Sequence, residues 1–208
     1  MQNFGLEQFA ANKNANDSLV LSIIRHRGPI SRADIARVSN LTASAVSYIT
    51  NKLIDAGMII EHETGQSSGG RRPILLKNNP DILNVIVVHL SSKQVRGYLV
   101  NGDLEIVEER KHPLSKSKMP DEAVIDLMIS TISELKQVAK SQIPGIGVVV
   151  RGPVKSKDGI SIFAPNLGWR NVPIKYIVEE KIGIPTFVEN DTRAMAIGEF
   201  YYGRKQYI

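Results

Sequence analysis

The segment Gly69-Gly70-Arg71-Arg72-Pro73 holds the residues of this sequence that are best suited to binding a charged partner. Two adjacent guanidinium groups beside two glycines form a small cationic tip, which can lie along phosphates or reach into the minor groove of DNA. A solvated β-turn would have the same composition. The sequence context favours the first interpretation, because three predicted helices precede the segment and a predicted strand follows it.

A second set of candidate residues lies on the predicted helix that follows Thr42. Val46, Ile49 and Leu53 recur at helical spacing and are expected to point inward. Small hydroxyl, amide and phenol groups then occupy the opposite face, where they can hydrogen-bond phosphates or base edges without holding the helix out of a major groove. For any one of these residues an ordinary solvated helix face is the alternative. The residues on this face are Ser44, Ser47, Tyr48 and Asn51.

Two shorter helices are predicted to position this one. Apolar residues at helical spacing predict a helix over Asn16–His26, which Gly28-Pro29 ends. Ser31 with Asp34 resembles a capping box and starts a helix over Arg32–Val38. A turn at Ser39-Asn40-Leu41 then leads to Thr42, the predicted cap of the third helix.

A hairpin is predicted after Gly57, with strands over Met58–Glu63 and Pro73–Lys77 and a turn over Thr64–Arg72. Three helices followed by a basic-tipped hairpin are typical of a winged helix-turn-helix that binds DNA. The predicted domain covers residues 1–79. Its predicted DNA-binding residues are Ser31, Arg32, Thr42, Ser44, Ser47, Tyr48, Asn51, Arg71 and Arg72.

Charge and composition limit the classes of function. Residues 1–80 carry nine Lys or Arg against six Asp or Glu, and residues 81–208 carry seventeen against fifteen, so the smaller part is denser in positive charge. No apolar run approaches the ~20 residues of a membrane span, and residues 1–16 contain no hydrophobic signal core. We therefore expect a cytoplasmic protein without a membrane partner.

Metal and thiol chemistry have no support in the sequence. The absence of cysteine excludes disulfides, thiol catalysis and thiolate zinc sites for these residues. The four histidines are scattered and form no metal-ligand spacing: His26, His62, His89 and His112.

Residues 80–208 are predicted to form an α/β domain. Three strands, with a tight turn at Asn101-Gly102-Asp103, precede a helix that starts at Pro120; an aliphatic strand, a helix, a strand and a last helix follow. The aliphatic strand is expected to be buried on both faces. The strands are Asn84–Leu90, Gln94–Asn101, Leu104–Lys111, Ile146–Val150 and Pro185–Val188, and the later helices are Pro173–Ile182 and Thr192–Tyr202.

Two polar motifs follow strands of this domain, at the edge where open α/β sheets bind ligands. They are Pro165-Asn166-Leu167-Gly168-Trp169 and Glu189-Asn190-Asp191. A cap for the last helix would explain Asp191 equally well, and for Trp169 we favour a packing role over a stacking platform.

The element order resembles the ribonuclease H-like half-domain of the actin and hexokinase superfamily. With Gly145-Ile146-Gly147, Gly152-Pro153-Val154, the two polar motifs and the glycine-arginine tip, the chain resembles the ROK family of sugar-responsive transcriptional regulators, which is related to bacterial sugar kinases. The resemblance implies that Asn166, Asn190 and Asp191 hold sugar hydroxyls, and that Asp191 would be the base in a kinase.

The sequence departs from the family pattern in two places. Sugar kinases of this type carry an Asp-x-Gly-Gly-Thr-like phosphate loop after the first strand, whereas this chain reads His89-Leu90-Ser91-Ser92-Lys93, which argues against phosphoryl transfer. Family members also continue into a second lobe with a zinc site. That lobe is absent from these residues, so no cofactor is expected here.

These observations predict a DNA-binding transcriptional regulator, and not an enzyme, for a carbohydrate-utilisation operon. We expect a repressor with a double-stranded DNA operator, a sugar effector such as xylose and a homodimeric assembly. A sugar kinase and a sugar-independent protein-interaction regulator are the alternatives.

Overall fold

Backbone contacts divide the chain into two units, Met1–Ile82 and Leu83–Ile208, in a computed structural model that describes residues 14–64, 72–114 and 120–203. The sequence places the boundary after Asn79, three residues before this division. The difference arises because Pro80–Ile82 form a 3-10 turn that bonds back to the first unit: the backbone N–H of Ile82 donates to the carbonyl of Asn79 at 3.3 Å. Each unit has a hydrophobic core of its own.

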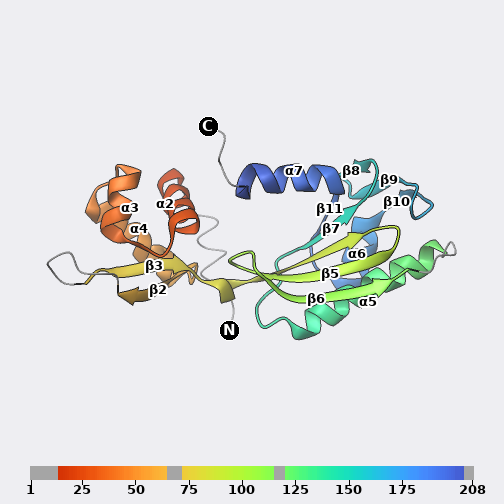
Figure 1. Ribbon diagram of the computed structural model, residues 1–208, viewed down its shortest axis with the longest axis horizontal. Helices are drawn as coiled ribbons and strands as arrows, with labels where there is room; N and C mark the ends of the chain where they lie inside the picture. The colour runs from red at the N-terminus through yellow and green to blue at the C-terminus, as the bar shows by residue number, and fades with distance from the viewer. Residues whose placement is uncertain (1–13, 65–71, 115–119, 204–208) are drawn as a thin grey trace. The chain divides into compact units, whose positions relative to one another are not determined.

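In the described residues, the first unit contains three α-helices and a small antiparallel sheet of strand order β1-β3-β2 (Figure 1). β2 and β3 pair to form the wing hairpin. The short strand β1, which the sequence analysis does not predict, pairs with β3 on its other side. The bounds are α2 (Ala15–Arg27), β1 (Ile30–Ser31), α3 (Arg32–Ser39), α4 (Ala43–Asp55), β2 (Ile59–Thr64), β3 (Ile74–Asn78) and the 3-10 turn η1 (Pro80–Ile82).

The helix starts follow the expected capping chemistry, with one difference. The hydroxyl of Thr42 accepts the backbone N–H of Ala45 at 3.2 Å, as predicted for the cap of α4. The hydroxyl of Ser31 accepts the N–H of Asp34 at 3.1 Å. The predicted capping box is incomplete, however, because the Asp34 carboxylate accepts the Ser31 hydroxyl at 2.7 Å instead of a backbone N–H.

The second unit is built on a five-stranded sheet of order β11-β7-β4-β5-β6. β5 is antiparallel to both of its neighbours, β4 and β6, and β4, β7 and β11 are parallel. The bounds are β4 (Asn84–Leu90), β5 (Gln94–Asn101), β6 (Ile106–Pro113), α5 (Asp121–Val138), β7 (Ile146–Val150), α6 (Ile174–Ile182), β11 (Thr186–Asn190) and α7 (Asp191–Tyr202).

The helix α5 lies along one side of this sheet and α7 along the other (Figure 1). Val124, Met128, Ile132 and Leu135 of α5 are fully or almost fully buried. A side chain at Gly97 of β5 would collide with Thr131 and Leu135, so glycine allows this close approach. The principal core therefore lies between α5 and the sheet.

The sequence analysis expects the strand β7 to be buried on both faces, but only one of its faces is. Ile146, Val148 and Val150 are completely buried, but Gly147 and Val149 are half-buried. α7 accounts for the difference, because no described residue of this helix is buried.

A second, three-stranded sheet of order β10-β9-β8 was not predicted. It lies between β7 and α6 along the chain, so the predicted order β-β-β-α-β-α-β-α is wrong at this point. The segment is rich in turns and its strands are short, which explains the missing signal. The bounds are β8 (Val154–Lys155), β9 (Ile160–Ala164) and β10 (Trp169–Val172).

None of the helices in the described residues is sufficiently long and apolar to span a lipid bilayer.

Candidate functional site

The helix α4 presents the predicted polar face to solvent. Its side chains Val46, Ile49 and Leu53 are buried in the core of the first unit, as the helical spacing predicts. Tyr48 is 73% exposed. On the same face Ser44 and Asn51 are exposed and Ser47 is half-buried. The helix is therefore held by one face while the other offers hydroxyl, amide and phenol groups to a partner.

Two of the other predicted DNA-binding residues have structural roles. Ser31 is only 4% exposed, and its hydroxyl is bonded to Asp34 at the start of α3. This hydroxyl is therefore occupied within the protein. Thr42 is exposed, and besides capping α4 its hydroxyl lies 3.1 Å from that of Ser44. Thr42 thus stands at the amino end of α4, where backbone N–H groups favour phosphate.

The guanidinium of Arg32 is bonded to other residues of the first unit and does not extend freely into solvent. Its guanidinium donates to the hydroxyl of Thr50 at 3.1 Å and to the amide oxygen of Asn51 at 3.4 Å. It also lies 3.4 Å from the carboxylate of Glu61 on β2. These three partners were not predicted, because no local pattern relates positions 19 and 29 residues apart.

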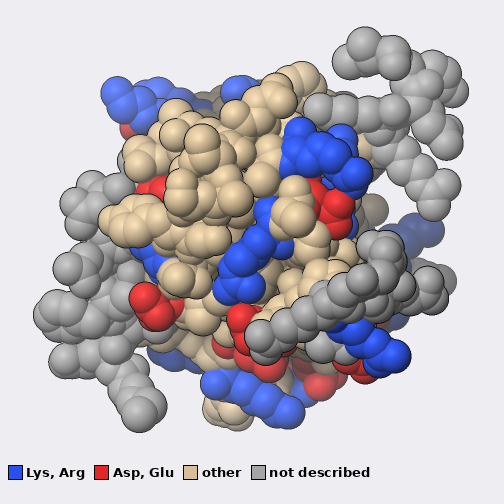
Figure 2. Space-filling model, turned by 90° about the vertical axis from the view of Figure 1, so that its left-hand side faces the viewer, with Lys and Arg blue, Asp and Glu red and all other residues tan. Residues whose placement is uncertain are grey.

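Of the two arginines that the sequence analysis predicts at the wing, the structure describes Arg72. Arg72 is exposed, two residues before β3 begins, and Arg71 lies outside the described residues. Among the described residues seen in Figure 2, Lys and Arg are interspersed with Asp and Glu and do not form one continuous basic surface. Positive charge on this side is therefore distributed in patches.

In the second unit, Asn190 starts α7. Its side-chain oxygen accepts the backbone N–H of Arg193 at 3.0 Å, and its amide nitrogen donates to the carbonyl of Gly152 at 2.9 Å. The suggested cap role of Asp191 is therefore wrong: Asn190 is the N-cap and Asp191 is the first residue of the helix. The amide of Asn190 thus joins the carboxyl ends of β11 and β7.

Asp191 keeps one carboxylate oxygen available. Its Oδ1 accepts the backbone N–H of Thr192 at 2.8 Å and the amide of Asn190 at 3.1 Å. Its Oδ2 has no hydrogen-bond partner among the residues that the structure describes. This oxygen can accept a hydroxyl group of a ligand.

Glu189, the residue before this pair, has a role that was not predicted. Both of its carboxylate oxygens accept the hydroxyl of Ser156, at 3.1 and 3.0 Å. Nearby on β8, a hydrogen bond to Asp158 raises the pKa of the exposed Lys155 ammonium, which stays charged at neutral pH. The quoted Glu-Asn-Asp run contained Glu189, but nothing in the sequence indicated Ser156.

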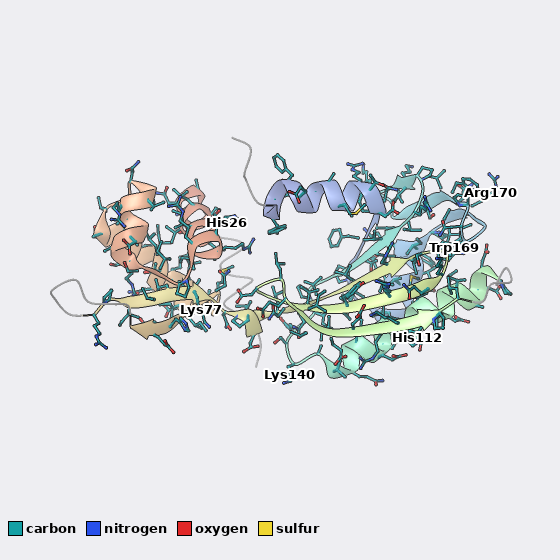
Figure 3. The ribbon with its side chains drawn as sticks, in the orientation of Figure 1. His26, Lys77, His112, Lys140, Trp169 and Arg170 are labelled. Carbon is teal, nitrogen blue, oxygen red and sulfur yellow. The ribbon has the colours of Figure 1, made fainter. Side chains whose placement is uncertain are left out.

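Asn166 occupies the turn between β9 and β10. Both polar atoms of its amide are buried and have no hydrogen-bond partner among the described residues. Trp169, labelled in Figure 3, is completely buried, as the packing interpretation predicts. The structure does not record a contact between Asn166 and Asn190 or Asp191 in the part of the chain that it describes.

The segment that would hold ATP phosphates in a kinase forms a tight turn here. The hydroxyl of Ser91 donates to the carbonyl of Gln94 at 2.9 Å, and the backbone N–H of Ser91 reaches the same oxygen at 3.1 Å. Within the described residues, no group of three or more His, Asp or Glu side chains is placed to hold a metal ion.

Comparison with protein families assigns both units. Residues 13–60 match the winged helix-turn-helix DNA-binding family, and residues 85–208 match the ROK family. Both predicted domain types are confirmed.

Curated relatives match along nearly the whole chain. The xylose repressor of Caldicellulosiruptor bescii is 33% identical over 194 residues, which are 92% of this chain and 48% of the relative. The DNA-binding transcriptional dual regulator NagC of Escherichia coli is 28% identical over 196 residues, 93% of this chain and 48% of the relative. The chain thus spans about half the length of the curated relatives it matches. Their names support the prediction of a regulator and not an enzyme.

Solved structures agree with this assignment. A ROK family transcriptional regulator described as a homolog of the E. coli MLC protein has a TM-score of 0.66 at 27% identity, over 90% of this chain and 48% of that one. A ROK family glucokinase of Streptomyces griseus, solved with glucose and AMPPNP, has a TM-score of 0.52 at 27% identity, over 59% of this chain and 38% of that one. The second unit therefore has the predicted fold of the actin and hexokinase superfamily. The chain belongs to the ROK family and carries a winged helix-turn-helix domain ahead of its ROK domain.

Proposed function

We propose that this protein is a transcriptional repressor of genes for carbohydrate use. The exposed polar face of α4, in a chain similar over 92% of its length to a xylose repressor, carries the proposal. In this function α4 lies in the major groove of the operator. Ser44, Ser47, Tyr48 and Asn51 contact bases and phosphates, while Arg71 and Arg72 at the wing supply affinity that does not depend on sequence.

The proposal assigns the response to a sugar to the ROK domain. With respect to the described residues, Asp191 offers a free carboxylate oxygen and the amide of Asn166 has unused donors and acceptors. Such groups bind sugar hydroxyls in fixed directions. Asn190, whose amide is already occupied, would contribute through one remaining lone pair or by exchanging a bond. Xylose is the effector that the curated relatives favour.

Binding of the sugar changes DNA affinity only if the two DNA-binding arrangements of the protein differ in sugar affinity. We propose a homodimer for the intact regulator, since two α4 helices can then read both halves of an inverted repeat. Location in the cytoplasm follows from this function.

Selection of sheared genomic DNA by the purified protein at moderate salt tests the DNA-binding function. Sequencing of the retained fragments should reveal an inverted repeat upstream of genes for sugar use. The Tyr48→Ala variant is the control, because an exposed side chain can be removed without unfolding the unit. Uniform retention by both proteins would contradict sequence-specific repression.

Calorimetry with a panel of monosaccharides tests the sensor separately. Binding heat with one sugar, lost in Asp191→Ala, is the expected result. Sugar binding without any DNA selection would point to a sugar protein outside transcription. ATP consumption that depends on sugar would support the alternative that the protein is a sugar kinase.

A further inference from the structure

Arg32 connects three elements of the winged helix at the base of the proposed DNA-binding face. It is the first residue of α3, and its guanidinium reaches Thr50 and Asn51 on α4 and Glu61 on β2. Thr50 is completely buried, and its hydroxyl donates to the carbonyl of Ser47 at 3.2 Å. The Arg32 side chain is 27% exposed.

These contacts reduce the suitability of Arg32 for a phosphate. Glu61, 3.4 Å away, already compensates the positive charge, and two donors of the fork are used within the protein. A phosphate contact would require Arg32 to leave these partners. Arg72 differs, because it is exposed and no ion pair to a described residue is recorded for it.

The same contacts determine how Asn51 is oriented. An amide carries an acceptor oxygen and a donor nitrogen on opposite branches, and a guanidinium carries only donors. Arg32 must therefore face the oxygen of Asn51, as observed at 3.4 Å. The NH₂ group is then the branch that remains for a partner, on an exposed residue with no other recorded bond within the described chain.

We propose that Arg32 is a positioning residue, which holds the amide of Asn51 so that this side chain presents a hydrogen-bond donor to DNA. The inference rests on the proposed DNA-binding function. A freely rotating Asn can bond adenine through both branches. An Asn51 held by Arg32 offers only its donor, which is matched to acceptors, namely guanine O6 and N7, thymine O4 or adenine N7, and it disfavours the cytosine amino group.

Selection from randomised duplexes, with a salt series on the selected site, tests this role in the 208-residue protein. Arg32→Met removes the donors and keeps an apolar stem. We expect it to reduce base preference about fivefold or more at the positions that Asn51→Ala also affects, which is ~1 kcal/mol. The double variant should lose no more than Asn51→Ala. The slope of log affinity against log salt should stay unchanged, whereas Arg72→Ala should lower it by about 0.9.

Asn51→Asp provides an independent variant that keeps the bond from Arg32. Its carboxylate turns an acceptor outward in place of the NH₂ group, so the preference should move towards cytosine, and thermal unfolding should show an intact fold. This variant tests the orientation even if Arg32→Met unfolds.

Two results would overturn the role of Arg32 alone. The first is unchanged base preference in Arg32→Met with a salt slope lowered by about 0.9, which identifies a phosphate contact. The second is wild-type preference in Asn51→Asp. Absence of any base preference in the wild-type protein would overturn the proposed function and, with it, this inference.

Discussion

The two units hold their candidate residues in opposite states. On α4, Tyr48 is 73% exposed and the neighbouring polar groups lie at the surface. In the ROK domain, Asn190 is bonded at the start of α7, and the amide of Asn166 is enclosed. The first unit can meet a rigid duplex without rearrangement. A sugar that contacts Asn190 or Asn166 must exchange internal bonds or move the β9–β10 turn, which is how a ligand can alter the structure of a sensor.

The largest expected effects on stability come from substitutions in the cores of the two units, which are separate. Trp169→Ala should destabilise the ROK domain by about 3–5 kcal/mol, because it removes a completely buried aromatic side chain. Leu53→Ala should destabilise the winged helix by about 2–5 kcal/mol. Segment-resolved hydrogen exchange checks both. Loss of protection in both units from either variant would show that they unfold together.

The next effect concerns an ion pair in the winged helix. Asp17 is buried, and its Oδ2 lies 2.7 Å from the Nζ of Lys52, whose side chain is 27% exposed. Lys52→Met leaves this carboxylate without its cation, and we expect a loss of about 3 kcal/mol in the free energy of unfolding. Urea denaturation measures it.

Asp17→Asn combined with Lys52→Met is the matched control for that loss. It removes the isolated charge and keeps an acceptor for the N–H of Asn14, so part of the stability should return. A change of less than 0.5 kcal/mol in Lys52→Met alone, roughly the size of a surface substitution, would mean that water already reaches Asp17.

Smaller effects on stability are expected from substitution of one candidate residue in each unit. Asn190→Ala should cost about 0.5–2 kcal/mol through loss of the cap on α7. Tyr48→Ala should change stability by less than about 0.5 kcal/mol while lowering DNA affinity. Thermal unfolding and fluorescence anisotropy with a duplex separate the two outcomes. Equal stability of both variants would contradict the difference between a bonded Asn190 and a solvent-exposed Tyr48.

The smallest effect on stability is expected at the wing. Arg72→Ala should leave unfolding unchanged and lower the salt slope of DNA binding by about 0.9, because one phosphate contact is lost. Binding isotherms at several salt concentrations measure the slope. An unchanged slope would place Arg72 outside the interface. Lys77→Ala removes a positive charge from the adjoining strand β3, and its salt slope serves as the comparison.

Prediction from sequence succeeded where local spacing decides the outcome. Val46, Ile49 and Leu53 recur with the period of a helix, so the buried and exposed faces of α4 follow directly. The strands β4 and β5 have the predicted bounds. Prediction failed for β8, β9 and β10, whose short strands carry no clear period, and for β7, whose outer face depends on how little α7 covers it.

The sequence by itself thus determined the winged helix, the ROK domain and the identity of the face that α4 presents, because helical periodicity and capping act over a few residues. Only the tertiary structure decided what those side chains can do. It brought Arg32 to Asn51 and Glu61, and it joined Asn190 to Gly152 across two strands. Such contacts depend on how separate elements pack, and no local pattern of residues encodes them.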